Sequence, residues 1–155
     1  MKRIGLVLFV VLFSSSVFSQ KYVYSCESVD GTEYYVYSDI VKTENFGIYQ
    51  VWVKMGYKGE SKNNAIKFIK KYRNDGITDE QIESSFYSEN VYLIDVNRNR
   101  SKLLKSSFWN LSGDVLESYS NNENETSWDY IRPESVLDSV LKTVKSLLKN
   151  KKWKN

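Results

Sequence analysis

The chain has 155 residues, of which 22 are Lys or Arg and 19 are Asp or Glu, with no histidine and a single cysteine. The lack of histidine excludes Ser–His and Cys–His nucleophile pairs and most zinc and copper sites. No Gly-rich phosphate loop occurs, because the glycines stand singly where turns are expected. We therefore expect no enzyme, with no catalytic residues, no cofactor and no metal site.

The first 19 residues have the organisation of a secretory signal peptide. Lys2 and Arg3 precede an apolar run over 4–13, three serines and a small residue, Ser19, at the expected cleavage site. The apolar run is shorter than the roughly 20 residues that a membrane span needs. No later stretch is apolar enough, so no transmembrane span is expected. We expect the mature chain to begin at Gln20 and to be exported to the periplasm, the cell surface or the medium.

The charge of the mature chain and its C-terminal end argue against several partners. Removal of the signal would lower the net charge from +3 to +1, which leaves no electrostatic reason to expect nucleic acid as a partner. The basic tail, 150–155, is expected to be a solvated, frayed end. We do not expect Cys26 to be lipidated, because the bulky Tyr24 does not suit a lipid-attachment signal.

Segments rich in Tyr, Val, Trp and Phe alternate with turn residues, which is typical of strands. Six segments have this pattern: 22–29, 33–38, 48–57, 90–96, 101–111 and 115–120. Asp30-Gly31 predicts a two-residue hairpin turn between the first two. Alternation places two sets of residues on a common face of their strands. These sets are Tyr49, Val51, Val53 and Met55, and Tyr92, Ile94 and Val96.

Helical spacing occurs in two places. Apolar residues recur over 65–72 among lysines, and Thr78 to Gln81 fits a capping box for one short turn. The stronger helix is C-terminal, with Pro133 suited to its first position. Its apolar stripe consists of Val136, Leu137, Val140, Leu141, Val144, Leu147 and Leu148. A helix with one apolar face needs a sheet to pack on.

These elements predict an α+β fold in a single domain, 20–149. We expect one antiparallel sheet of about six strands, packed by the C-terminal helix, with a helical insertion between the third and fourth strands.

Several motifs in this chain are also found in one bacterial family. They are "GTEYYVYSDIV" over 31–41, "VWVK" over 51–54, "YLIDVNRNRSKL" over 92–103, a later Gly turn, and a Trp and Ile-x-Pro pattern before the last helix. In this order they resemble the surface-adhesin protein E family of Gram-negative bacteria. The matching residues are Tyr34, Tyr35, Ile40, Val51, Trp52, Val53, Asp95, Asn97, Arg98, Gly113, Trp128, Ile131 and Pro133. Tyr37 stands where the family usually has Asp. The resemblance implies a small sheet with a C-terminal helix.

The cysteines depart from the family pattern. Two family cysteines join a strand to the last helix, and the corresponding positions here are Val96 and Val144. The resemblance implies that these two valines meet in the core. Cys26 is therefore not half of that bridge. We expect it to be a small, half-buried thiol that shares a face with Tyr22 and Tyr24, while an intermolecular disulfide remains the alternative.

The function expected from the sequence is that of an exported binding or adhesion-type module with a protein or envelope component as partner. The resemblance implies adhesion, and Tyr, Ser and Asn are frequent in the loops, as in surfaces built for protein contact. The candidate contact surface is Tyr34, Tyr35, Tyr37 and Trp52, with core roles expected for at least half of them. The alternative is a periplasmic ligand-binding or envelope-assembly protein.

Overall fold

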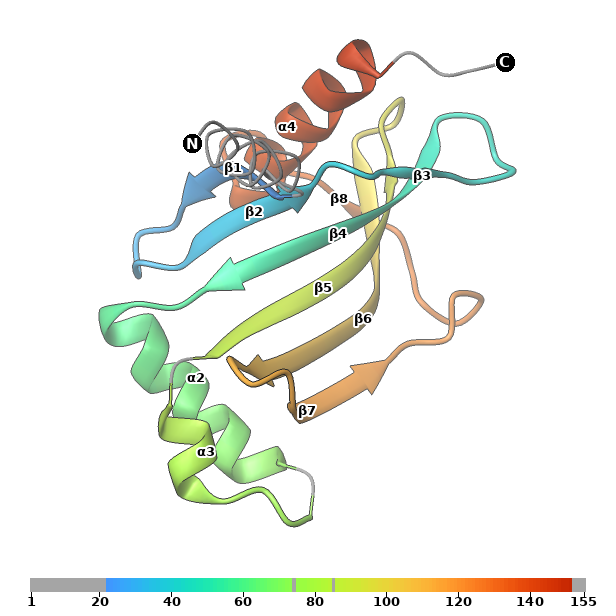
Figure 1. Ribbon diagram of the computed structural model, residues 1–155. Coiled ribbons are helices and arrows are strands. Elements are labelled where there is room, and N and C mark those ends of the chain that lie inside the picture. The colour runs from blue at the N-terminus through green and yellow to red at the C-terminus, as the bar shows by residue number, and fades with distance from the viewer. Residues whose placement is uncertain (1–21, 74, 85, 152–155) are drawn as a thin grey trace, which may run out of the picture.

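The computed structural model describes residues 22–73, 75–84 and 86–151 (Figure 1). Its elements, in chain order, are β1 (Tyr22–Glu27), β2 (Glu33–Tyr37), β3 (Val41–Lys42), β4 (Ile48–Gly56), α2 (Gly59–Tyr72), α3 (Asp79–Glu83), β5 (Phe86–Asp95), β6 (Arg100–Asn110), β7 (Val115–Ser120), β8 (Asp129–Tyr130) and α4 (Val136–Asn150). The signal predicted for 1–19 and the end of the basic tail, 152–155, lie outside the described residues.

The described strands form one eight-stranded sheet with the order β1-β2-β4-β5-β6-β7, in which β3 pairs with β4 and β8 with β6. All of these pairs are antiparallel. The predicted α+β fold is confirmed, including the helical insertion, because α2 and α3 separate β4 from β5. The two shortest strands were not predicted, since two residues are too few to show an alternating pattern.

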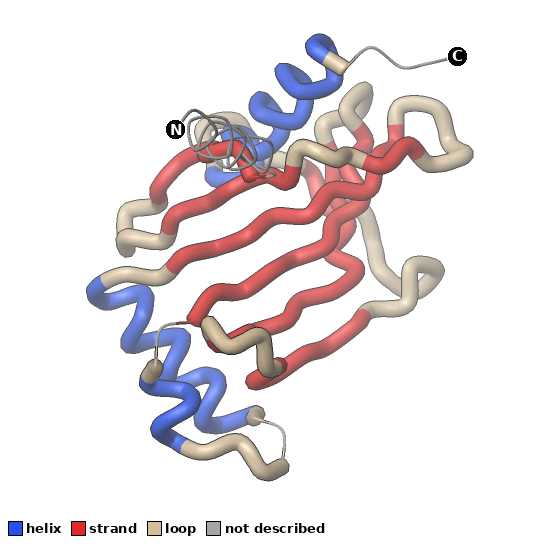
Figure 2. Tube along the Cα trace, in the orientation of Figure 1, coloured by secondary structure: helices blue, strands red, loops and turns tan. Residues whose placement is uncertain are grey.

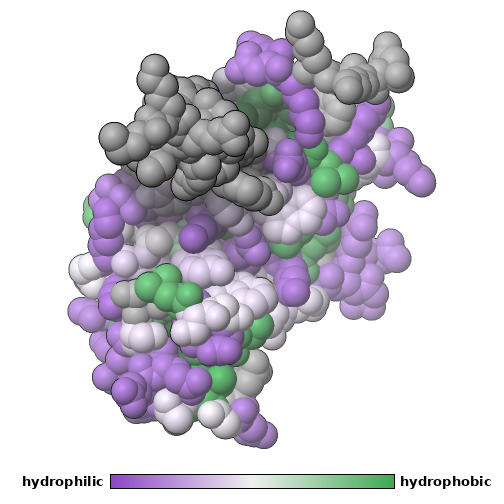
Figure 3. Space-filling model, viewed as in Figure 1, coloured by the Kyte–Doolittle hydropathy of each residue, from purple (hydrophilic) through white to green (hydrophobic). Residues whose placement is uncertain are grey.

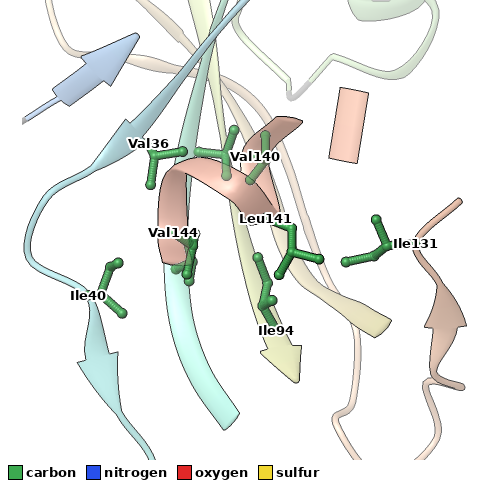
Figure 4. Close-up of a cluster of buried hydrophobic side chains, with 9 residues drawn as sticks. Val36, Ile40, Ile94, Ile131, Val140, Leu141 and Val144 are labelled. Carbon is green, nitrogen blue, oxygen red and sulfur yellow. The ribbon is translucent and has the colours of Figure 1, made fainter. Parts of the chain in front are cut away.

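The C-terminal helix packs on one face of the sheet. Val36 in β2, Val51 and Val53 in β4 and Ile94 in β5 point to this face, which we call the helix-bearing face. They form the first core with Ile40, Ile131, Val140, Leu141 and Val144. Figure 4 shows Val140 beside Val36, and Leu141 between Ile94 and Ile131. The first core therefore joins strands β2, β4 and β5 to the C-terminal helix.

Val96 and Val144 lie in the same region of the structure. Val144 is fully buried in α4, and Val96, which directly follows β5, is a partly buried residue packed against the same cluster. Both valines therefore contribute to the packing of α4 on the sheet.

The start of α4 differs from the prediction, which placed Pro133 at its first position. The helix begins at Val136, and its N-cap is Ser135, whose Oγ accepts a hydrogen bond from the Asp138 backbone N–H at 3.2 Å. Ser is among the preferred N-cap residues because its side chain satisfies a free N–H of the first turn. Pro133 lies instead in the turn before the helix.

A second core lies under the helical insertion. Ala65 and Ile69 of α2 and Ile82 of α3 pack against Phe86, Phe108 and Leu116 of β5, β6 and β7. Figure 2 shows the helical insertion at one corner of the sheet and α4 at the opposite one. The predicted capping box of α3 is confirmed, since Thr78 Oγ1 accepts from Gln81 N at 3.3 Å and Gln81 Oε1 accepts from Thr78 N at 2.8 Å.

Part of the segment 92–103, quoted above for the resemblance, forms the turn between β5 and β6. Asp95 Oδ1 accepts hydrogen bonds from the backbone N–H groups of Asn97 and Arg98, at 3.2 and 3.1 Å. Its Oδ2 accepts from Arg100 Nε at 3.0 Å. Gly47 has a φ of +78°, and a Cβ there would come within 2.1 Å of Asn97 Nδ2. The motif therefore builds a turn, and Gly47 is required beside it.

A β-bulge in β1 corrects the predicted position of Cys26. Tyr24 pairs with Tyr35 and Cys26 with Tyr34, so Ser25 is an extra residue. Cys26 Sγ lies 4.0 Å from the carbonyl oxygen of Val136, and Thr143 Oγ1 donates to Ser25 Oγ at 3.0 Å. Cys26 therefore faces α4. The prediction that it shares a face with Tyr22 and Tyr24 is wrong, while its half-buried position is confirmed.

The hairpin between β1 and β2 is longer than predicted. Glu27 pairs with Glu33, so residues 28–32 form the loop instead of two residues alone. Gly31 has the expected positive φ, +85°, and the Ser28 N–H donates to the Thr32 carbonyl at 2.9 Å. Asp30 Oδ1 also accepts from the Thr32 N–H, at 3.1 Å, which closes the longer loop.

The packing of α4 predicts a large effect for Leu141→Ala. Leu141 is 3% exposed in the first core, and a buried Leu→Ala change costs about 2–5 kcal/mol. The same change at Leu111, which is 72% exposed, should alter stability by less than about 0.5 kcal/mol. Denaturant unfolding of both variants tests this, and equal midpoints would contradict the assigned core.

Glu117 in β7 predicts a pH-dependent stability. Its side chain is buried, and its Oε2 has no hydrogen-bond partner among the described residues. Burial raises the pKa of this carboxyl above its ordinary value of 4.5. The folded protein therefore holds this proton more tightly than the unfolded chain does. The contribution to stability is present below pH 4.5 and is lost as the pH rises through the raised pKa.

Glu117→Gln should therefore stabilise the protein at pH 7, by about 1 kcal/mol. The gain should shrink at pH 4, where the wild-type carboxyl is protonated in the folded protein. Thermal unfolding of wild type and variant at both pH values measures the difference. A gain of equal size at pH 4 would show that burial of charge is not its cause.

Candidate binding surface

The face of the sheet opposite the helices carries a continuous group of aromatic side chains. Both cores lie on the helix-bearing face, so the alternate residues of each strand point the other way. We call this second side the aromatic face. Its central members are Tyr22, Tyr24, Tyr35, Tyr37, Trp52, Lys54, Tyr87 and Glu89. The space-filling view shows pale, near-neutral surface over the middle of the sheet, bordered by hydrophilic side chains (Figure 3).

The rings of the aromatic face contact one another across neighbouring strands. Tyr22 and Tyr37 have ring centroids 5.2 Å apart, and Tyr37 meets Trp52 edge-on at 6.4 Å. Tyr24 and Tyr35 form another edge-on pair at 5.6 Å. Such tilted and edge-to-face arrangements are favoured by the ring quadrupoles. The rings therefore hold one another in place before any partner arrives.

Two charged residues are built into the aromatic face. Lys54 Nζ lies 4.1 Å from the ring centroid of Tyr87 and 5.6 Å from that of Tyr22, which are cation–π distances. The Tyr22 hydroxyl donates a hydrogen bond to Glu89 Oε1. Burial and the neighbouring Glu89 carboxylate raise the pKa of Tyr22, so the hydroxyl stays a hydrogen-bond donor at neutral pH.

A hollow opens beside these rings. It has a volume of about 520 Å³ and is lined by Tyr22, Tyr37, Asp39, Val41, Trp52 and Glu89. We call it the Trp52 hollow. Its described lining holds two carboxylates and no basic side chain. Aromatic walls with acidic groups at the edge suit a partner group that is cationic or rich in hydrogen-bond donors.

The structure brings together three of the four residues that the sequence offered as a contact surface. Tyr35, Tyr37 and Trp52 lie on the aromatic face. Tyr34 lies between Glu33 and Tyr35 and therefore points to the helix-bearing face, where it packs against the first core. Sequence reasoning missed Tyr22 and Glu89. Alternation identifies the face of Tyr22, but no local pattern reveals that it lies beside Glu89, 67 residues later.

Neither a metal centre nor a membrane helix is found in the described part of the chain. Among residues 22–73, 75–84 and 86–151, no group of three or more Cys, Asp or Glu side chains is placed to hold a metal ion. Within the same ranges, no helix combines the length and the apolar character needed to cross a membrane.

Comparisons of the chain with family models, with curated proteins and with solved structures find no match. The functional argument therefore rests on the geometry of the surface itself.

The hydrogen bond between Tyr22 and Glu89 predicts a difference between two Tyr→Phe variants. Tyr22→Phe removes a bond to a charged acceptor and should lower stability by about 1.5–3 kcal/mol. Tyr24→Phe changes a ring of the same strand that is 53% exposed and should have little effect. Denaturant unfolding measures both, and equal stability of the two variants would show that the bond to Glu89 contributes nothing.

Proposed function

We propose that the protein is an exported binding module that holds a partner protein or envelope component against the aromatic face, with the Trp52 hollow as its centre. The observation that carries this proposal is the hollow itself, where three aromatic rings meet two carboxylates. The predicted signal peptide supports export, and the resemblance to the surface-adhesin protein E family supports an adhesive role.

The chemistry of the aromatic face favours binding. Trp and Tyr bury large areas at low conformational cost and are enriched among the residues that dominate binding energy. Here Tyr22, Tyr37 and Trp52 are already held by contacts with each other. Binding therefore costs little side-chain conformational entropy. This arrangement supports a preformed contact surface.

The charges favour a basic partner segment. Asp39 and Glu89 line the hollow. Lys54, the cross-strand neighbour of Glu89, lies over the Tyr87 ring and is not among the described lining. A Lys or Arg side chain of the partner would lie over the Trp52 or Tyr37 ring and approach one of the carboxylates. We therefore propose that the recognised segment carries basic and apolar residues side by side.

The arrangement offers little for catalysis. The chain has no histidine, and the raised pKa of Tyr22 makes its hydroxyl a poor base near neutral pH. The carboxyl with a raised pKa, Glu117, lies in β7, away from the Trp52 hollow. These features support a binding role for the aromatic face.

A pair of peptide probes tests the proposal. A hexapeptide of alternating Lys and Leu should bind the mature protein at least about tenfold more tightly than its Glu and Leu counterpart. Tyr37→Ala should weaken binding of the basic peptide by about tenfold. The matched control is Tyr130→Ala, which changes a ring that is 63% exposed in β8. Calorimetry measures all four affinities.

Two results would overturn the proposal. Equal affinity for the two peptides would contradict the preference for a basic segment. An equal loss of affinity in Tyr37→Ala and Tyr130→Ala would contradict the Trp52 hollow as the binding site. Protease accessibility of the protein on intact cells tests export, and full protection together with retention of residues 1–19 in the intact mass would contradict it.

A further inference from the structure

A second cavity lies on the helix-bearing face, between α2 and the sheet. It has a volume of about 330 Å³, and the β1–β2 loop closes one side of it. We call it the α2 pocket. Its lining includes Asp30, Tyr57, Phe68, Ser106, Phe108 and Tyr119. The size is within the range of cavities that bind small molecules, and the pocket shares no residue with the Trp52 hollow.

Aromatic rings form the walls of the α2 pocket. Tyr57 and Phe108 are nearly parallel, with centroids 6.1 Å apart, and Phe68 lies 5.7 Å from Phe108. The Tyr57 hydroxyl is hydrogen-bonded to Ser88 Oγ at 2.6 Å, and burial raises its pKa to about 12. Phe68 and Tyr119 are 42% and 41% exposed. The deep rings are therefore held in place, while the outer ones remain accessible.

A buried hydrogen-bond acceptor without a partner lies directly beside this pocket. Asn90 in β5 is 7% exposed and is the cross-strand neighbour of Ser106, which lines the pocket. Its Nδ2 donates to the Tyr92 hydroxyl at 3.1 Å, and its Oδ1 has no partner among the described residues.

A second such acceptor lies on the other side of β6. Glu117 in β7 is the cross-strand neighbour of Phe108, and its Oε2 likewise has no partner within the described part of the chain. Buried polar groups in proteins are almost always hydrogen-bonded, and one left unsatisfied is costly. Neither Asn90 nor Glu117 is among the described lining residues of the α2 pocket, so the choice of ligand rests on the residues that do line it.

The charge of the α2 pocket favours a cationic ligand. Asp30 is the single charged residue among its described lining residues. Hydrogen bonds from Ser28 Oγ and from the Thr32 N–H lower the pKa of this carboxyl, so it is ionised at neutral pH. An anion would be repelled there, whereas a protonated amine would meet a carboxylate and ring faces.

We propose that the α2 pocket is a binding site for a small molecule that carries a protonated amine on an apolar body. The site is independent of the aromatic face. It would carry the ligand-binding role that was the alternative in the sequence analysis, with the amine beside the Asp30 carboxylate and the apolar body against the aromatic rings of the lining.

Two probes that differ only in charge test this site. Phenethylamine and 2-phenylethanol have the same ring and the same number of heavy atoms, but only the first is a cation at pH 7. Phenethylamine should bind saturably and about tenfold more tightly than the alcohol, as expected for a cation beside a carboxylate and aromatic rings. Amide chemical shifts should change in α2 and around Ser106.

Substitutions in and outside the α2 pocket test whether phenethylamine binds there. Tyr119→Ala and Asp30→Asn should each weaken the phenethylamine binding that is read from the shifts in α2 and around Ser106, by about three- to tenfold. Tyr37→Ala, which alters the aromatic face, should leave these α2 and Ser106 shift changes as they are in the wild type. Tyr130→Ala controls for the loss of an exposed ring, and thermal unfolding checks that each variant is folded.

Three outcomes would overturn the inference. These are no saturable phenethylamine binding at millimolar concentrations, equal affinity for the alcohol, or shift changes confined to the aromatic face. Because the peptide probes address the Trp52 hollow, a failure here leaves the proposed function standing, and a failure there leaves the α2 pocket standing.

Discussion

The packing of α4 onto the valines of β2 and β4 is the contact on which the rest of the structure depends. Val36, Val51 and Val53 are almost completely buried against Val140 and Val144. Because side chains along a strand alternate between faces, this burial fixes where every other residue points. A shift of one residue would move Tyr35, Tyr37 and Trp52 under the helix and expose the valines. Packing against α4 therefore fixes which residues of β2 and β4 face the helix, and the residues between them form the aromatic face.

All described helices that contribute to a core pack on the same side of the sheet, and this asymmetry creates both candidate sites. The first core covers one end of the helix-bearing face and the second core covers the other. Between them lie small or polar residues of β5 and β6, namely Ser88, Asn90 and Ser106, which neither core fills. The α2 pocket lies at the edge of the second core, where Ala65, Phe108 and Ser106 contribute to its lining. The face without helices presents its rings outward.

The two sites share a chemical preference but differ in shape. Each combines aromatic side chains with carboxylates and has no basic residue in its described lining. The Trp52 hollow lies on a broad ordered surface, which suits a protein segment, whereas the α2 pocket is smaller and has buried acceptors beside it. A binding module that holds a partner on one face and a small molecule on the other is consistent with this arrangement.

The sequence by itself determined the fold class, the six long strand segments, the helical insertion and the apolar stripe of α4, because these depend on spacings within one element. It grouped Tyr34 with Tyr35, Tyr37 and Trp52 as one contact surface, without separating the two sides of the sheet. Alternation within "EYYVY" already separates Tyr34 from Tyr35, and the direction of each follows once Val36 is assigned to the core. The type of each element and the alternation of its side chains can be predicted from residues two to four positions apart.

The tertiary structure alone decided the features that depend on pairing between distant segments. The extra residue at Ser25 turns Cys26 towards α4, and no pattern within β1 reveals a bulge that is defined by its register against β2. Tyr22 meets Glu89, and Asn90 comes to lie beside the cavity under α2, only because β5 returns across the sheet. These contacts are set by the register of whole strands and by helices that pack across them, which is long-range information that local spacing does not contain.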